Sequence, residues 1–155
     1  MKLDILTELK YFFSVAMRDF SFFGSFVYFI FAILFLLILG QVDFAIKFLI
    51  GIIVLTSIEV LIKLFYKHKR PDFYKIKPSS LFENFEENTS FPSGHTGKAT
   101  MFAVMISKTY SNFYLTSLFG LIALLVGLSR LSKHRHYLSD VIGGWVLGFI
   151  VGIMI

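Results

Sequence analysis

Two long runs of apolar residues near the N-terminus constrain this chain more than any other feature of its sequence. Residues 22–39 read FFGSFVYFIFAILFLLIL and contain no charge, which is about long enough to cross the hydrocarbon core of a bilayer. Residues 44–62 form a second run, and it includes Lys47 and Glu59. Charges are costly in hydrocarbon unless they are shielded or lie near an interface. We therefore expect two transmembrane helices here, with these charges protected.

Three further runs, 93–107, 113–129 and 138–155, are also predicted to be spans. The first of them is the least apolar, because it includes Thr96, Lys98, Thr100 and Ser107, so its neighbours should shield it from lipid. The last run has glycines four residues apart, at Gly144, Gly148 and Gly152. Such spacing lets another helix approach closely. The sequence thus predicts an all-α, polytopic membrane helix bundle of about five transmembrane helices in a single domain, 1–155.

Two segments are expected to lie outside these spans. Residues 1–20 mix charged and apolar positions at helical spacing, which is typical of an amphipathic helix lying along the membrane interface; an ordinary packed helix fits the pattern equally well. The charges there argue against a cleavable signal peptide. Residues 67–92 are polar and predict an extramembrane loop, with a short surface helix beginning near 78–82.

The composition supports a membrane protein. Hydrophobic residues make up 56% of the chain and charged residues 16%, against about 25% charged in an average soluble domain. The mean hydropathy is +0.75. The chain has no cysteine, which excludes disulfides and thiolate metal sites. Its net charge of +5 suggests anionic partners such as lipid headgroups or a phosphorylated substrate. A nucleic-acid partner is disfavoured, since the basic residues lie between apolar spans.

The connectivity of five spans brings the most informative polar residues together. The end of the second span, the start of the third, the end of the fourth and the start of the fifth must all meet one membrane face. Three clusters of polar residues lie at those four ends, and each has a structural and a functional interpretation.

The first cluster is Lys63-x6-Arg70-Pro71. Lys63 and Arg70 are nearly two helical turns apart, so they share a face if the helix continues to Arg70. Pro71 disfavours helix at the residue before it and is expected to end the helix there. Two cations reaching into one space suit a tetrahedral dianion. The alternative is that both cations snorkel to the membrane boundary.

The second cluster is Phe91-Pro92-Ser93-Gly94-His95, at the start of the third span. Proline is favoured in the first turn of a helix, serine can cap it, and glycine leaves the backbone N–H groups bare. A helix N-terminus with free amides is a natural phosphate site. His95 would lie beside that site and could donate a proton. The alternative is an ordinary helix start with an incidental histidine.

The third cluster is Ser129-Arg130-x5-His136-x3-Asp140. His136 and Asp140 are neighbours if this stretch is helical. A carboxylate on one imidazole nitrogen fixes the tautomer and leaves the other nitrogen free to attack. Asp140 could instead serve only as a helix cap.

Together the three clusters resemble the type-2 phosphatidic acid phosphatase superfamily. That pattern is Lys-x6-Arg-Pro, Pro-Ser-Gly-His and Ser-Arg-x5-His-x3-Asp, and this chain fills it without substitution over about residues 63–144. Members commonly have six membrane helices, whereas five are predicted here. Either the N-terminal segment replaces the first helix or the chain is a shortened member.

The resemblance implies a role for each motif residue. His136 is the nucleophile that forms a phosphohistidine, Asp140 orients it, and His95 protonates the leaving oxygen and later activates water. The phosphoryl oxygens are held by Lys63, Arg70, Ser93, Gly94 and Arg130. This is phosphoryl transfer by positioning and charge neutralisation, and we expect it to need no metal and no cofactor. His68 and His134 lie inside motif gaps and are expected to be exposed, Lys98 is expected to snorkel, and Trp145 is expected to pack.

The implied function is hydrolysis of a phosphomonoester or diphosphate on a lipid in a cell (inner) membrane. Candidate substrates are undecaprenyl diphosphate, phosphatidylglycerophosphate, phosphatidic acid and lipid A 1-phosphate. A lipid-to-lipid phosphotransferase and a non-catalytic lipid-binding or transport protein are the alternatives. Soluble vanadium haloperoxidases share similar motifs but lack apolar spans. Most Lys and Arg residues lie on the catalytic side, which by the positive-inside rule places it in the cytoplasm; the resemblance favours the periplasmic face, and we expect that face.

Overall fold

The computed structural model describes residues 12, 15–17, 20–71 and 89–155. Within them the chain forms a short 3₁₀ turn, η1 (Ser21–Gly24), and five α-helices. These are α2 (Phe26–Ile38), α3 (Val42–Phe65), α5 (Gly94–Tyr110), α6 (Phe113–Ser132) and α7 (Leu138–Met154). All regular structure in the described part is helical, so the prediction of an all-α membrane helix bundle is confirmed. The expected helices within 1–20 and near 78–82 lie largely or wholly outside the described residues.

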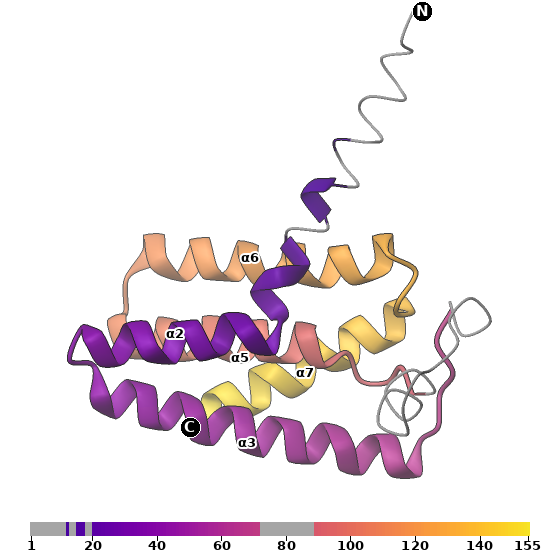
Figure 1. Cartoon of the computed structure of the whole chain (residues 1–155), viewed down its shortest axis with the longest axis horizontal. Helices are drawn as coiled ribbons and strands as arrows, with labels where there is room; N and C mark the ends of the chain where they lie inside the picture. Colours follow the sequence, from indigo (N-terminus) through magenta and orange to yellow (C-terminus); the bar gives the residue numbers. More distant parts are fainter. Residues whose placement is uncertain (1–11, 13–14, 18–19, 72–88) are drawn as a thin grey trace, which may run out of the picture.

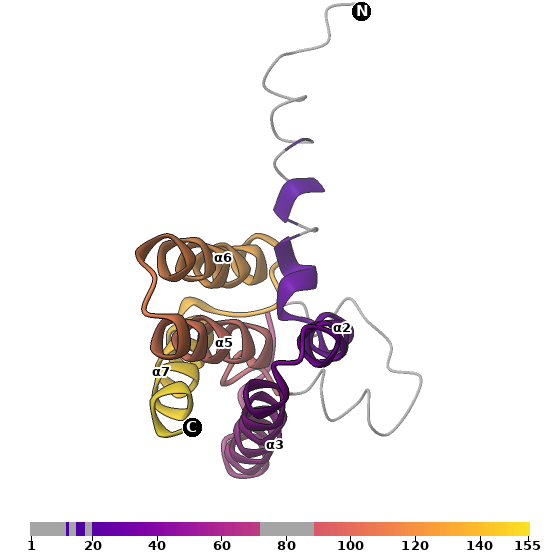
Figure 2. The same ribbon diagram turned by 90° about the vertical axis from the view of Figure 1, so that its left-hand side faces the viewer.

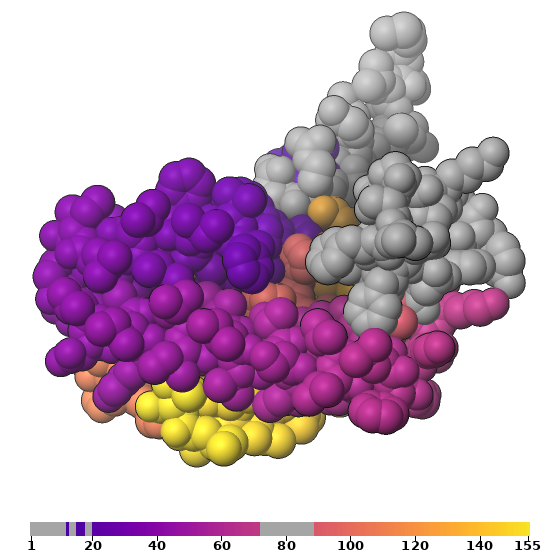
Figure 3. Space-filling view, turned by 60° about the horizontal axis from the view of Figure 1, so that its bottom comes forward, coloured from indigo at the N-terminus to yellow at the C-terminus, as the bar shows by residue number. Residues whose placement is uncertain are grey.

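The helices run roughly side by side, and α5 lies at the centre of the bundle (Figures 1 and 2). It packs most extensively against α7 and α6, and it also contacts α3 and η1. As expected, this least apolar helix is shielded, with both Thr96 and Lys98 buried. Figure 3 shows α3 running along one face of the molecule, with α2 on one side of it and α7 on the other.

Two of these helices, α3 and α6, are long and apolar enough to cross a membrane, and a third span is counted if a bent pair that ends in α2 acts as one. The helix α7 is apolar but shorter. The five helices occupy the five predicted ranges, while the number of membrane crossings stays a prediction.

The first predicted span, 22–39, was expected to be one continuous helix, but the helix is interrupted at Ser25. Ser25 adopts an extended conformation between η1 and α2, and its side chain accepts a hydrogen bond from the Tyr28 backbone N–H at 3.2 Å. Serine is a favoured N-cap residue, so it starts a new helix at Phe26. The break turns η1 across the ends of α5 and α6, where it reaches the predicted site.

The glycines of α7 allow the predicted close approach, and their partner is α5. A Cβ atom added at Gly144 would lie 2.6 Å from the Ser93 carbonyl oxygen, and one at Gly152 would lie 2.8 Å from the Val104 Cβ. A Cβ at Gly148 would overlap the Gly97 carbonyl oxygen. Only glycine at these positions lets the two backbones touch, and this contact fixes the start of α7 against the start of α5.

The hydrophobic core lies away from the predicted site, between α2, α3 and α5. Its centre is aromatic: the rings of Phe48 and Phe102 lie 4.5 Å apart, and Phe29 packs edge-on against Phe48 at 5.5 Å. Offset and edge-to-face pairs of this kind stabilise beyond the area that they bury. The core thus holds one end of the bundle and leaves the other end for polar residues.

Candidate active site

The four helix ends that were expected to share one face do so. The end of α3, the start of α5, the end of α6 and the start of α7 gather at one end of the bundle (Figure 1). The backbone N–H of Ser93 donates to the Asp140 carbonyl oxygen at 2.9 Å, which ties the second motif to the third. The motif residues are therefore brought together by backbone contact as well as by loop length.

The start of α5 presents Ser93 and Gly94, both buried. Ser93 is the N-cap residue, but its hydroxyl makes no capping hydrogen bond and lies 3.0 Å from the Thr96 hydroxyl instead. The backbone amides of the first turn are thus not consumed by a serine cap. Amides at a helix N-terminus favour an anion, which is consistent with the predicted phosphate site.

His136 and Asp140 lie together, although His136 precedes α7 and is not helical. The His136 Nδ1 is 3.6 Å from the Asp140 Oδ2, an ion-pair separation slightly longer than a hydrogen bond. Both residues are buried. Asp140 Oδ2 also accepts the backbone N–H of Tyr137 at 2.8 Å, so Asp140 caps α7 as well. One carboxylate thus starts the helix and also faces the histidine.

The pKa of His136, which lies in the connection between α6 and α7, is set mainly by burial. Burial lowers the pKa of its imidazole to about 4; the Asp140 carboxylate opposes this shift, while the charges of Arg130 and Arg70 add to it. The ring is consequently neutral at neutral pH, which is the state that a nucleophilic nitrogen requires.

His68 was expected to be exposed and without a direct role; its side chain is 36% exposed, but it contacts Asp140. Its Nδ1 lies 3.3 Å from Asp140 Oδ1, on the side of the carboxylate opposite to His136, and 3.0 Å from the Ser90 hydroxyl. Ser90 itself is fully buried and donates its hydroxyl to the His68 carbonyl oxygen at 3.0 Å. Asp140 therefore lies between two histidines. His134, in contrast, is exposed as expected.

Arg70 reaches the site by a path that the sequence did not predict. The helix α3 ends at Phe65, so Lys63 and Arg70 do not share a helical face. Pro71 biases the backbone before it toward extended conformations, and here the whole segment from Tyr66 to Arg70 is non-helical. The positive charge of Arg70 nevertheless acts on both His95 and His136.

Arg130 lies in the last turn of α6, inside the same cluster. It is buried, and its Nη1 donates to the Ser21 hydroxyl of η1 at 2.9 Å. Its charge acts on His95 and on His136. The 3₁₀ turn also touches His95 directly, because a Cβ at Gly24 would lie 2.8 Å from the His95 Cβ. Ser21 and Gly24 thus border the candidate site, which the sequence analysis missed because it treated 22–39 as one apolar run; the N-cap residue Ser25 was the signal for the bend.

Lys63 is buried and paired rather than snorkelling. Its Nζ lies 2.5 Å from Glu59 Oε1, one helical turn earlier. The second carboxylate oxygen of Glu59 is 3.4 Å from the Nζ of Lys98, which is also buried, so the expectation that Lys98 snorkels was wrong. Glu59 is shielded as its cost in hydrocarbon required. In the sequence, the only sign of the pairing between Glu59 and Lys98 was that opposite charges occur in two neighbouring predicted spans.

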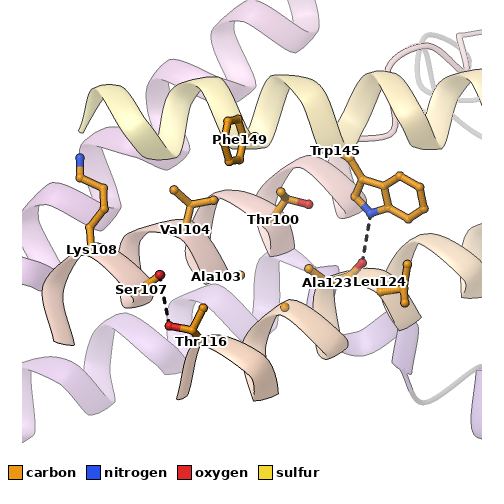
Figure 4. A pocket seen from close by; sticks show the side chains of 11 residues that line it. Thr100, Ala103, Val104, Ser107, Lys108, Thr116, Ala123, Leu124, Trp145 and Phe149 are labelled. Carbon is orange, nitrogen blue, oxygen red and sulfur yellow. Dashed lines mark hydrogen bonds between the residues drawn. The ribbon is translucent and has the colours of Figure 1, made fainter. Parts of the chain in front are cut away.

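Three apolar grooves of the described part lie away from these motifs. One of about 450 Å³ lies between α5, α6 and α7, and Figure 4 shows Phe149, Trp145 and Leu124 around it. Trp145 donates its ring N–H to the Ala123 carbonyl oxygen at 3.3 Å, so it packs α7 on α6 as expected. Among the described residues, no group of three or more metal-ligating side chains is found; whether the reaction needs a metal stays a prediction.

Comparison with known proteins agrees with this arrangement. Phosphatidylglycerophosphatase B of Bacillus subtilis is 34% identical over 93 residues, which is 53% of this chain and 41% of that protein. The chain thus spans less than half the length of this curated relative.

Two solved structures share the fold. The crystal structure of Aquifex aeolicus LpxE has a TM-score of 0.75 and 25% identity, over 92% of this chain and 84% of that one. The first transmembrane PAP2-type phosphatidylglycerolphosphate phosphatase from Bacillus subtilis has a TM-score of 0.74 and 22% identity, over 92% and 74%. The family model described as PAP2 superfamily matches residues 44–155. This match includes all three motifs, and the chain therefore belongs to the PAP2 superfamily.

Proposed function

We propose that this chain is a membrane phosphatase that removes a phosphate group from a lipid through a phosphohistidine on His136. The observation that carries the proposal is the position of the His136–Asp140 pair. It lies at the end of the bundle where Arg70, Arg130 and His95 also converge. A scaffold or transporter has no need of a neutral imidazole beside a carboxylate and two guanidinium groups.

The first step follows from this geometry. Asp140 faces Nδ1 of His136, which leaves Nε2 to attack phosphorus. As the Nε2–P bond forms, the P–O bond to the lipid breaks, and His95 donates a proton to the leaving oxygen. The charge that develops on the phosphoryl oxygens is met by Arg70, Arg130, Lys63 and the amides of Ser93 and Gly94.

The second step returns the enzyme to its starting state. His95, now deprotonated, takes a proton from a water molecule that attacks phosphorus, and the P–N bond breaks. Inorganic phosphate leaves and His136 is again neutral. The cations and amides of this site neutralise phosphate without help, so the proposed reaction needs no divalent ion.

For the lipid, phosphatidylglycerophosphate is the first candidate, because the curated relative from Bacillus subtilis carries that activity in its name. The chain would act as a single domain of the inner membrane, with its active site on the periplasmic side. A membrane-impermeant lipid analogue added to intact cells tests that orientation.

The deciding experiment is release of inorganic phosphate by the purified protein in detergent with EDTA. Phosphatidylglycerophosphate, undecaprenyl diphosphate, phosphatidic acid and lipid A are each offered to the wild type and to His136→Ala. We expect release from at least one lipid that is absent in the variant, and an acid-labile, base-stable phosphoprotein after rapid quenching. Activity lost with EDTA and restored by a metal would refute the metal-free mechanism; release by His136→Ala at the wild-type rate would refute the nucleophile.

A further inference from the structure

A buried group of three charges lies beside the proposed phosphate site, and the mechanism above uses only one of them. Lys63 and Lys98 both contact Glu59, at 2.5 Å and 3.4 Å. All three residues are less than a tenth exposed. Two ammonium groups thus share one carboxylate, and one positive charge is left over.

The position of the group ties it to the start of α5. The Lys98 Nζ also lies 3.5 Å from the Gly94 carbonyl oxygen, one turn earlier in α5. The Glu59 carboxylate lies against Gly94 itself, where an added Cβ would overlap both carboxylate oxygens. The charge of Lys98 also acts on His95. The group therefore lies directly against the helix turn that would hold the substrate phosphate.

Lys98 affects how much of the positive charge of Lys63 the Glu59 carboxylate neutralises. A buried carboxylate facing Lys63 alone would cancel its charge, and charges in a low-dielectric site interact strongly. Lys63 would then have little attraction for a phosphate dianion. With the Lys98 ammonium on the same carboxylate, the negative charge of Glu59 is shared between two cations, and it neutralises Lys63 less.

We infer that Lys98 is a positioning residue: it shares Glu59, and so leaves the charge of Lys63 available to the phosphate group of the substrate. The inference rests on the proposed function, since it takes Lys63 as a phosphate ligand. Lys98 itself does not touch the substrate. Glu59 holds the Lys63 side chain in place, and Lys98 keeps Glu59 from neutralising it.

The test is the dissociation constant of inorganic phosphate, measured by titration calorimetry of the full chain in detergent. Lys98→Met leaves Glu59 to Lys63 alone, and we expect phosphate to bind about tenfold more weakly, a change of about 1.4 kcal/mol. The double variant Glu59→Gln/Lys98→Met removes both the carboxylate and the second cation. Lys63 then regains its charge, and binding should return to within about threefold of the wild type.

Two controls separate this role from a structural one. Lys108→Met removes the same charge from the other end of α5, where Lys108 donates to the Ile153 carbonyl oxygen at 2.6 Å, and should leave the constant unchanged. Lys98→Arg keeps the charge and should bind phosphate like the wild type. If Lys98→Met does not fold, Lys98→Gln replaces it in the same comparison with Lys98→Arg.

The inference is overturned if Lys98→Met binds phosphate as the wild type does, or if the double variant binds as weakly as the single one. A wild type that binds no inorganic phosphate would overturn it as well. The titration does not depend on turnover. A chain that binds phosphate in the expected order but releases none from any lipid would defeat the proposed function and leave this inference standing.

Discussion

Ser93 donates its backbone N–H to the Asp140 carbonyl oxygen at 2.9 Å. These residues lie at the starts of α5 and α7, two helices that are not consecutive in the chain. The bond sets the proposed phosphate-binding turn against the turn that carries Asp140, the partner of the proposed nucleophile. A main-chain bond does not depend on side-chain rotamers, so the relative position of the two turns is fixed before any substrate arrives. Preorganisation of this kind is what phosphoryl transfer requires of a protein.

Asp140→Asn is expected to lower kcat for phosphate release by about 10² to 10⁴-fold, as loss of the orienting carboxylate does in other histidine-based sites. An asparagine oxygen can still accept the Tyr137 N–H that starts α7, so the fold should survive. Phosphate release and the thermal unfolding midpoint are measured together. Ser132→Ala, at an exposed residue that bonds only within α6 at 3.1 Å, is the control. A fall in the midpoint that accounts for the lost activity would show that Asp140 is only a cap.

His68→Ala is expected to lower kcat about tenfold with little change in KM, because a charge-assisted hydrogen bond to a buried carboxylate is worth about 1.5–3 kcal/mol. Because His68 would act on the transition state only indirectly, by orienting Asp140, we expect only part of that energy to appear as a change in kcat. His68→Asn keeps a donor near the carboxylate and should recover part of the rate. His134→Ala, at the exposed histidine, serves as the control. An increase in KM alone would instead place His68 at the lipid headgroup.

Stability should depend on pH through His136. Its pKa of about 4 in the folded chain is below the value of about 6.5 for an unfolded chain. Above pH 6.5 neither state is protonated and the contribution is constant. As the pH falls from about 6.5 to about 4, His136 binds a proton in the unfolded state but not in the folded state, so the free energy of unfolding declines.

The thermal midpoint of the wild type should therefore fall more steeply over this window than that of His136→Gln, which cannot titrate. Both proteins are measured in the same detergent at pH 7.5, 6, 5 and 4. Parallel curves for the two proteins would contradict the low pKa of His136.

Gly148→Ala should destabilise the bundle by about 1–3 kcal/mol, since a methyl group there meets the α5 backbone and overpacking has about that cost. Gly120→Ala is the matched control, because a Cβ at Gly120 has no atom within 4 Å, and alanine favours the helix by about 1 kcal/mol. The two variants should thus shift the unfolding midpoint in opposite directions. A loss of activity in Gly148→Ala at temperatures where it stays folded would show that the α5–α7 contact also sets the site geometry.

The sequence predicted the helices and the convergence of the motifs because both follow from local patterns. Apolar runs mark helices, and the number of crossings dictates which ends meet. The sequence left open whether Lys63 and Arg70 share a helical face; α3 ends at Phe65, so they do not. His68 was missed because its partner Asp140 lies 72 positions away, and no local pattern reports such a contact.

The pairing of Lys98 was missed for a different reason. A lysine near the end of a span can extend to the membrane surface or pair with an acid on another helix, and the local sequence of α5 is the same in both cases. Only the rotation of α3 about its axis, which aims Glu59 at Gly94, decides between them. That rotation is set by packing of the whole bundle.

The central helix has a consequence for how the protein is made. α5 is the least apolar of the five helices and carries Lys98, whose counter-charge belongs to α3. On leaving the translocation channel alone, it would face lipid with an uncompensated charge and a row of hydroxyl groups, a cost of several kcal/mol. Stable insertion of α5 therefore waits for its neighbours. α3 is made earlier and supplies Glu59, and α7 is made later and supplies the glycine face that packs on α5. The candidate site is therefore assembled in the same event that makes the bundle stable in the membrane.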